Sequence, residues 1–212
     1  MPVFHAGRNQ TPPWCELERF EFLELQAGEC RTLRRQGRKE EFIVCRGQVT
    51  FALGDAEFTL GEGGKLDLSG PGVKSLKLRA AGGTPLVCRM SGRWQAITSS
   101  GIFSAQTATP PAFDTPYPYR KTTGFDNHYH DCDEYWILFE GAATAASEGS
   151  LYEVGPGDCI ATGMGWHHDV VTVHDNQPLR AIWFEGTLEG RKRVGHLWEP
   201  KHGKAKPVRA RV

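Results

Sequence analysis

The sequence predicts an all-β protein built as two β-barrels in tandem. Its 212 residues include 25 glycines and 13 prolines, scattered so that they divide the chain into short segments. Many of these segments alternate apolar and polar residues, as half-buried strands do, and long amphipathic helical patterns are absent. The second half of the chain also repeats the spacing of the first half. A chain of this length can bury the cores of two small domains.

Short strands account for most of the first half of the chain. The clearest signal is a hairpin, in which Gln48–Leu53 and Ala56–Leu60 flank the turn residues Gly54 and Asp55. Further strands are expected at 20–25, 40–47, 65–68, 73–80 and 85–90. The first eighteen residues contain Pro12-Pro13-Trp14 and are expected to form an irregular docked arm. We therefore assign residues 1–98 to a first barrel.

Prolines mark the boundary between the halves. Pro110, Pro111, Pro116 and Pro118 interrupt any long element. Nearby aromatic residues would pack this part of the chain against a surface. We assign residues 99–122 to a connecting segment.

The second half repeats the plan of the first at a period of about ninety residues. Glu134 precedes Gly141 by seven positions, as Glu40 precedes Gly47. Similarly, His168 follows Gly157 by eleven positions, and Ser75 follows Gly64 by eleven. Repeats of this length indicate duplication of a β-barrel unit rather than a solenoid. Residues 123–190 are therefore the second barrel, and residues 191–212 a basic C-terminal tail.

The stretch from Gly124 to Gly141 carries the clearest chemical signal. His128 and His130 are two positions apart, so both imidazoles leave an extended chain on the same side. Glu134 begins the next predicted strand, and His168 is a candidate fourth ligand. Imidazoles and a carboxylate suit a divalent transition metal, here one Fe, Mn, Zn or Ni ion per chain.

These residues resemble the two motifs of the cupin superfamily, small barrels of the jelly-roll kind. The first motif is matched by His128, His130, Glu134 and Gly141, with Gly124 nearer to the histidines than usual. The second is matched by three residues: Gly157, Gly165 and His168. It departs from the family at two turn or peripheral positions, where Gly163 replaces a proline and Thr172 an asparagine. The resemblance implies a metal held by His128, His130, Glu134 and His168.

The first half resembles the family only in its turn spacing and strand pattern. The positions that match the four ligands are Arg34, Gln36, Glu40 and Ser75. Arginine offers no lone pair, and one carboxylate with neutral oxygens is a weak set of ligands for a transition metal. We expect a metal-free copy that supplies packing, a lid or a dimer surface. Its arginines could instead bind an anion.

Other residues near the motif are assigned by their odd or even position along a predicted strand, which decides the face of the strand that they occupy. Trp136, Leu138, Val170 and Thr172 fall on the ligand-bearing faces and would line a substrate pocket, although they could equally be ordinary barrel core. Asp126 shares parity with His128 and is the best candidate for an acid–base or supporting group. His167 would replace His168 as the ligand only if the turn is bulged.

The remaining histidines carry no such signal. His174 is expected on the surface. His5, His196 and His202 have no partner that the sequence identifies.

Composition limits the partners and the compartment. Lysine plus arginine and aspartate plus glutamate both total 25, so no global charge draws the protein to nucleic acid or membrane. The excess of basic residues after Arg191 fits a solvated terminus better than an anion-binding tail. Six dispersed cysteines without a CxxC pair are expected to be reduced thiols. No signal peptide or membrane-spanning segment is evident, so a cytoplasmic protein is expected.

Three functions are compatible with such a centre. The first is a metal-dependent isomerase or lyase acting on a small hydroxylated or carboxylated substrate, such as a sugar or sugar acid. The second is an Fe(II)-dependent dioxygenase. The third is a non-catalytic small-molecule or metal-binding module, because fold alone does not decide function. By analogy with other cupins, a homodimer is expected.

Overall fold

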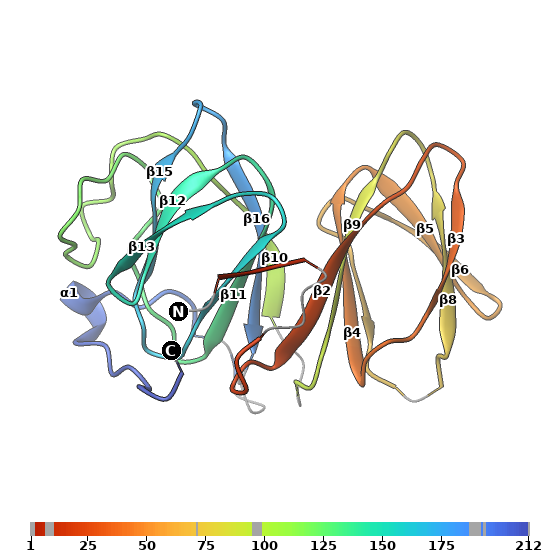
Figure 1. Ribbon diagram of the computed structural model, residues 1–212, viewed down its shortest axis with the longest axis horizontal. Coiled ribbons are helices and arrows are strands. Elements are labelled where there is room, and N and C mark those ends of the chain that lie inside the picture. The colour runs from red at the N-terminus through yellow and green to blue at the C-terminus, as the bar shows by residue number, and fades with distance from the viewer. Residues whose placement is uncertain are drawn as a thin grey trace. The chain divides into compact units, whose positions relative to one another are not determined.

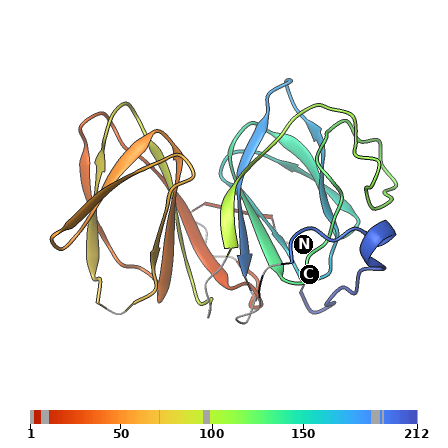
Figure 2. The same cartoon turned by 180° about the vertical axis from the view of Figure 1, so that it is seen from behind.

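The computed structural model describes residues 3–6, 11–70, 72–94, 99–186, 192 and 194–211. Nearly all of its regular structure is antiparallel β-sheet, which confirms the all-β prediction (Figures 1 and 2). The described residues include one helix, α1 (Glu199–His202). No helix among them has the length and apolar character needed to cross a membrane. The chain divides into two compact units, one made mainly of residues 16–94 and the other mainly of residues 95–212.

The first unit is a barrel of two four-stranded sheets. One sheet has the order β2 (Leu17–Glu24), β9 (Leu86–Gly92), β4 (Lys39–Arg46) and β7 (Lys65–Leu68). The other has the order β3 (Cys30–Arg34), β8 (Ser75–Ala80), β5 (Gln48–Leu53) and β6 (Ala56–Gly61). The predicted hairpin is present, with Leu53 paired to Ala56 across its two-residue turn.

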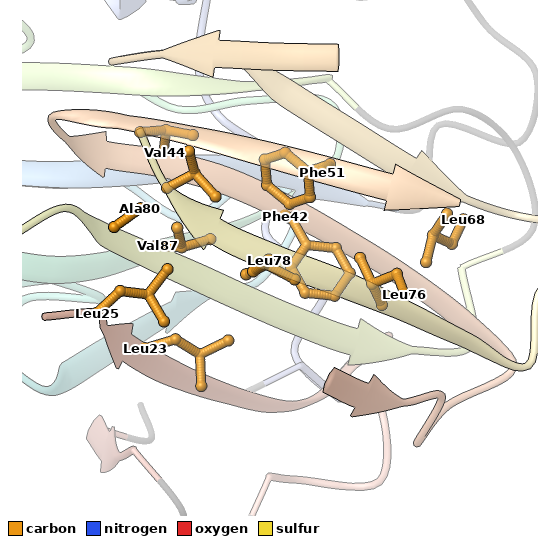
Figure 3. Packing of buried hydrophobic residues seen from close by; sticks show 11 residues of the cluster. Leu23, Leu25, Phe42, Val44, Phe51, Leu68, Leu76, Leu78, Ala80 and Val87 are labelled. Atoms are coloured by element: carbon orange, nitrogen blue, oxygen red, sulfur yellow. The ribbon is translucent and has the colours of Figure 1, made fainter. Parts of the chain in front are cut away.

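Apolar side chains from both sheets fill this barrel (Figure 3). Phe42 on β4 meets Phe51 on β5 edge-on, with ring centroids 6.0 Å apart, and both rings are fully buried. Leu76 and Leu78 on β8 pack into the same cluster. The alternation of buried and exposed residues on β8 follows the period of two that the sequence shows.

The second unit is a barrel of five and three strands. Its larger sheet has the order β1 (Val3–His5), β14 (Asp158–Thr162), β11 (Asp133–Glu140), β16 (Leu179–Gly186) and β10 (Ser99–Ala105). Its smaller sheet has the order β13 (Ser150–Val154), β12 (Ala143–Ser147) and β15 (His168–Val173). An apolar cluster that includes Leu138, Val170 and Leu179 fills the space between them.

The register of paired strands shows the internal repeat directly. In the first barrel Arg34 lies opposite Ser75, and in the second barrel His128 lies opposite His168 in a β-bridge. These are the positions that the spacing of the two halves matched to each other. The sequence alignment of the halves therefore corresponds to equivalent places in the two barrels.

The limits of the barrels differ from those expected. Val3–His5 is not an irregular arm of the first barrel but pairs with β14 of the second. Ser99–Ala105, expected to start the connecting segment, is strand β10 and pairs with β16 along its whole length. Both segments complete main-chain hydrogen bonding at the edges of a sheet, a role that their side chains do not reveal.

The C-terminal residues were expected to be solvated, but the structure places them against the second barrel. We call residues 194–211 the C-terminal strap. Arg211 Nη1 donates to both carboxylate oxygens of the buried Asp133, at 2.8 Å each. The amide of Val208 donates to the carbonyl of Met164. The excess of basic residues predicted a solvated tail because the sequence does not show that Arg211 pairs with a buried aspartate.

Candidate metal centre

Four side chains converge where the two sheets of the second barrel approach each other. His128 and His130 come from the chain that leads into β11, Glu134 lies on β11, and His168 is the first residue of β15. Each offers one ligand atom, and these atoms lie within 4.8 Å of one another. All four residues are buried, with exposed fractions of 4% or less. The structure thus brings together the complete set that the sequence motifs selected.

Main-chain pairing sets this geometry. The amide of His168 donates to the carbonyl of His128 at 2.9 Å, and the amide of His128 donates back at 3.3 Å. The bridge fixes the two imidazole rings with centroids 4.3 Å apart, and the ring of His130 lies 4.8 Å from that of His128. His128 and His130 share a side as predicted, although isolated bridges hold this stretch rather than a full strand.

A hydrogen-bond acceptor behind each imidazole sets its tautomer. Nδ1 of His128 lies 2.8 Å from the carbonyl oxygen of Asp126, Nδ1 of His130 lies 3.0 Å from that of Gly195, and Nδ1 of His168 lies 3.3 Å from that of Trp166. A carbonyl only accepts hydrogen bonds, so each Nδ1 carries the proton. In all three rings the lone pair is therefore on Nε2, the atom directed at the common centre.

The charge states also suit a cation. Burial raises the pKa of Glu134, but the neighbouring His130 and His168 outweigh it, so its pKa lies well below the ordinary value. Oε2 of Glu134 lies 2.6 Å from Nε2 of His168 and 3.4 Å from Nε2 of His130. Burial lowers the pKa of both His128 and His168. Burial thus favours the neutral form of His128 and His168, and the neighbouring rings favour an ionised Glu134.

These residues fit a divalent transition metal. Within the described part of the chain, Nε2 of His128 is buried without a hydrogen-bond partner. Leaving such an atom unpaired costs about 1–3 kcal/mol in a protein interior. Three nitrogens and one carboxylate oxygen are a common donor set for Mn, Fe, Zn or Ni. These four side chains would hold such an ion.

Asp126 lies beside His128 and lines a neighbouring pocket together with Phe125. Its Oδ2 accepts hydrogen bonds from Nδ1 of His196 at 2.7 Å and from Nε1 of Trp198 at 2.6 Å, and it lies 3.4 Å from Nδ1 of His128. Burial alone would raise the pKa of Asp126, but its interactions with His196 and Trp198 have the larger combined effect, so the pKa lies below its usual range. Through Oδ2, this carboxylate supports His128, the second of the two roles that the sequence left open for Asp126.

A small aromatic cavity opens beside the four residues. Its volume is about 90 Å³, and His128 and Glu134 form its polar end. The rings of Phe103, Phe125 and Trp136 contact one another with every centroid pair 5.2 Å apart. The lining consists of Phe103, Phe125, His128, Glu134, Trp136, Trp183 and His196.

Only one of the four pocket residues expected from parity lies in this lining. Trp136 does, and its ring lies 4.9 Å from that of His168. Leu138 and Val170 are fully buried in the apolar core, the alternative that parity left open. Thr172 accepts a hydrogen bond from Thr122 at 3.2 Å on a neighbouring stretch. Parity identifies the face of a strand but not the depth along the barrel.

The sequence missed the lining residues that come from other strands. Trp183 lies opposite Trp136 in the register of β16 and β11, so both share one face. His196 belongs to the strap. On β16, Glu185 lies opposite Glu134, and its carboxylate lies 3.6 Å from Nδ1 of His130. Only knowledge of strand pairing would have revealed Trp183 and Glu185.

The other histidines lie outside this cluster. Nε2 of His167 lies 3.5 Å from the carboxylate of Glu199, so the alternative in which His167 replaces His168 is not the observed geometry. His174 is half-exposed and bonds to Thr144 on a neighbouring strand. His202 accepts a hydrogen bond from the amide of Trp198.

Comparison with known proteins places the chain in context. No family model matches it. The uncharacterized protein y4oW of Sinorhizobium fredii is 40% identical over 207 residues, which cover 97% of this chain and 94% of that protein.

Solved structures share the fold at low identity. AerE from Microcystis aeruginosa has a TM-score of 0.55 at 8% identity, covering 79% of this chain and 86% of its own. A mutant of oxalate decarboxylase OxdC from Bacillus subtilis has a TM-score of 0.54 at 11% identity, covering 78% of this chain and 67% of its own. The chain thus belongs to the same family as y4oW, and it has the cupin-type jelly-roll fold.

Proposed function

We propose that the second barrel binds one divalent transition metal through His128, His130, Glu134 and His168. We propose further that the protein is a metal-dependent enzyme of the isomerase or lyase type, acting on a small carboxylated or hydroxylated substrate. The observation that carries the proposal is the shared tautomer of the three buried imidazoles, each held by a carbonyl on Nδ1. A structural histidine needs no such arrangement, whereas a metal ligand does.

The cavity supports a small substrate. A bound metal would polarise a carboxylate or hydroxyl group and lower the pKa of bound water. Phe103, Phe125 and Trp136 give the remainder of the space an apolar lining, which would strengthen electrostatic interactions at its polar end. A sugar would need a polar partner for each hydroxyl, and this lining offers few. The geometry therefore favours a small carboxylate over a sugar.

The fold shared with oxalate decarboxylase supports this class of reaction. Oxalate decarboxylase, named for a small dicarboxylate, contains Mn(II) centres. Its likeness to this chain is one of fold, at 10% identity over 78% of the chain with a TM-score of 0.54. Mn(II) and small carboxylates are therefore the first metal and the first substrates to test.

An Fe(II)-dependent dioxygenase is the second candidate, and the same aromatic lining favours it. An apolar space beside a bound metal would also suit oxygen and an apolar substrate. A third candidate, a module that binds a small molecule or metal without catalysis, has the same donor set. Activity measurements separate the three.

The first experiment tests the ligand set. The protein is purified without added metal, and metal content and affinity for Mn²⁺ are measured for the wild type, His168→Ala and His167→Ala. We expect stoichiometric binding by the wild type and by His167→Ala, which changes the adjacent histidine. His168→Ala should lose at least about tenfold in affinity. Equal binding by all three would show that the four-residue assignment is wrong.

The second experiment tests the reaction class. The metal-loaded protein is incubated with small carboxylates, sugar acids, phenols and thiols, once under strict anaerobiosis and once with an oxygen electrode. Turnover of a carboxylate without oxygen supports the isomerase or lyase proposal. Substrate-dependent oxygen uptake by the iron form would replace it with the dioxygenase. Binding without turnover in either condition would favour the non-catalytic module.

A further inference from the structure

The C-terminal strap runs directly beside the chain that carries two of the candidate ligands. Tyr129, which lies between His128 and His130, exchanges two main-chain hydrogen bonds with Leu197, each 3.0 Å long. Its hydroxyl donates to the carbonyl of Gly203 at 2.9 Å. The ligand-bearing chain is therefore held from the strap side as well as from β15.

The strap also supplies the acceptor that sets the tautomer of His130. The carbonyl oxygen of Gly195 lies 3.0 Å from Nδ1 of His130, although the two residues are 65 positions apart in the chain. Without this acceptor, Nδ1 of His130 would keep only a longer contact with the carboxylate of Glu185, 3.6 Å away, among the contacts described for it.

A second contact braces His128. The ring of His196 stacks on that of His128, with centroids 3.6 Å apart and planes 3° from parallel. His196 and Trp198 both donate to Oδ2 of Asp126, whose main-chain carbonyl accepts from His128. Two strap residues thus hold the aspartate that sets the tautomer of His128, and one of them also limits the movement of the ring.

The strap is fixed to the barrel at its far end, so its position is not incidental. A side chain at Gly163 would collide with the carbonyl oxygen of Arg211. A side chain at Gly165, which has a φ of +78°, would collide with the carbonyl of Lys206. The turn between β14 and β15 therefore accepts the strap only because both positions are glycine. Arg211 adds its paired hydrogen bonds to Asp133.

We infer that the C-terminal strap is a part of the metal centre and that His196 is a positioning residue for the ligand His128. The inference rests on the proposed function, because it assigns the strap a role at the same four residues. His196 acts through the stacked ring and through Asp126, and Gly195 acts on His130. The site is incomplete without a segment that lies outside both cupin motifs.

The test uses full-length His196→Ala and His196→Phe, with His202→Ala as a matched control in the same strap. The alanine removes both the stacked ring and the hydrogen bond to Asp126, while the phenylalanine keeps a ring and loses only the hydrogen bond. The exposed His202 contacts Trp198 but none of the four candidate ligands. Affinity for Mn²⁺ and the EPR spectrum of the bound ion are measured for each protein.

We expect His196→Ala to lower the affinity by about 10–100-fold and to change the EPR spectrum, as loss of a supporting partner does at other metal sites. His196→Phe should fall between His196→Ala and the wild type, and His202→Ala should match the wild type. Affinity within about twofold of the wild type for His196→Ala, with an unchanged spectrum, overturns the inference.

A metal-free measurement keeps this test separate from the proposed function. The tautomer of His128 is read from long-range ¹H–¹⁵N correlations in the apo protein. The wild type should show a single Nδ1–H form, and His196→Ala a mixture of the two tautomers. If the wild type binds no metal, the proposed function fails while this spectrum still reports on the strap. An unchanged tautomer in His196→Ala shows that the strap does not position His128.

Discussion

At the scale of single residues, the buried glutamate that both barrels carry at matching positions has a different charged partner in each. In the first barrel Glu40 is fully buried and pairs with the guanidinium of Arg89 at 2.9 and 3.0 Å. In the second barrel Glu134 has His130 and His168 as its ion-pair partners among the described residues. The first barrel thus carries its own cation, whereas the second presents donors for one.

Removing that built-in cation should destabilise the first barrel. Arg89→Met leaves the carboxylate of Glu40 buried without its partner, and breaking a buried pair costs about 3–5 kcal/mol. Chemical denaturation measures the loss in free energy of unfolding. Arg79→Met, in an exposed pair with Glu57, is the control and should cost less than about 1 kcal/mol. A similar small cost for both would show that Glu40 does not need Arg89.

The buried imidazoles predict how many protons are released when metal binds. Because burial holds the pKa of His128 and His168 below the ordinary value near 6.5, both are already neutral in the folded protein at pH 7. Metal binding should then release less than about one proton per ion. Calorimetric titration with Mn²⁺ in buffers of different ionisation enthalpy measures this release. Release of about two or more protons would mean that these imidazoles were charged before binding.

The same shifts set the direction of acid sensitivity. In the unfolded chain these histidines take up protons as the pH falls through about 6.5, whereas the folded protein binds them only at lower pH. The unfolded state therefore binds more protons in this window, and their contribution to the stability of the metal-free protein is lost as pH falls below about 6.5. Denaturation midpoints between pH 7.5 and 5.5 test the sign.

At the scale of elements, a buried lysine joins the connecting segment to a ligand-bearing strand. The Lys121 side chain is fully buried, and Nζ lies 2.8 Å from Asp114 and 2.8 Å from Asp169, which follows His168 on β15. Asp114 in turn accepts from the amide of Asn127, the residue before His128. One ammonium group therefore links the approaches to two of the candidate ligands.

Replacing this lysine should weaken the second barrel. Lys121→Met leaves two carboxylates without their shared cation, and we expect a loss of about 3–5 kcal/mol in the free energy of unfolding. Lys77→Met, at an exposed position on β8, should be nearly neutral. Adding Asp169→Asn to Lys121→Met should recover part of the loss by removing one buried charge. Absence of any recovery would show that the cost comes from packing alone.

The features that could be predicted are those that leave a pattern in a short stretch of sequence. Alternation and turn residues located the hairpin Gln48–Leu53 and Ala56–Leu60, and motif spacing selected His128, His130, Glu134 and His168. Trp183 and the role of His196 depend on which distant segments lie side by side, and neither repeats a local pattern. The strap was missed because its many charges suggested solvent, whereas its contacts are main-chain hydrogen bonds, which depend little on side-chain type.

At the scale of the whole molecule, the two barrels should depend on metal differently. In the first, Arg89 pairs with Glu40, the residue that matches Glu134, while the second leaves buried ligand atoms that a cation would satisfy. A ligand that binds only the folded form adds about 2.7 kcal/mol of stability when its free concentration is a hundredfold above Kd. This gain should belong to the second barrel alone.

Metal removal should therefore shift one unfolding transition and leave the other in place. Scanning calorimetry of the metal-loaded protein with and without EDTA should show the second barrel melting earlier in chelator, with the first barrel unchanged. Glu134→Gln should melt like the chelated protein whether or not metal is present. Equal shifts of every transition on chelation would contradict the assignment of the metal to one barrel.

The long sequence separation of the strap contacts has a consequence for how the centre assembles during synthesis. Gly195 lies 65 positions after His130, and Arg211 lies 78 positions after Asp133. Contacts that close such long loops form late, because the entropy of loop closure must be met first. A nascent chain can display all four candidate ligands before the segment that braces them has left the ribosome. Competence to retain metal should then appear only after the strap has been synthesised and has docked.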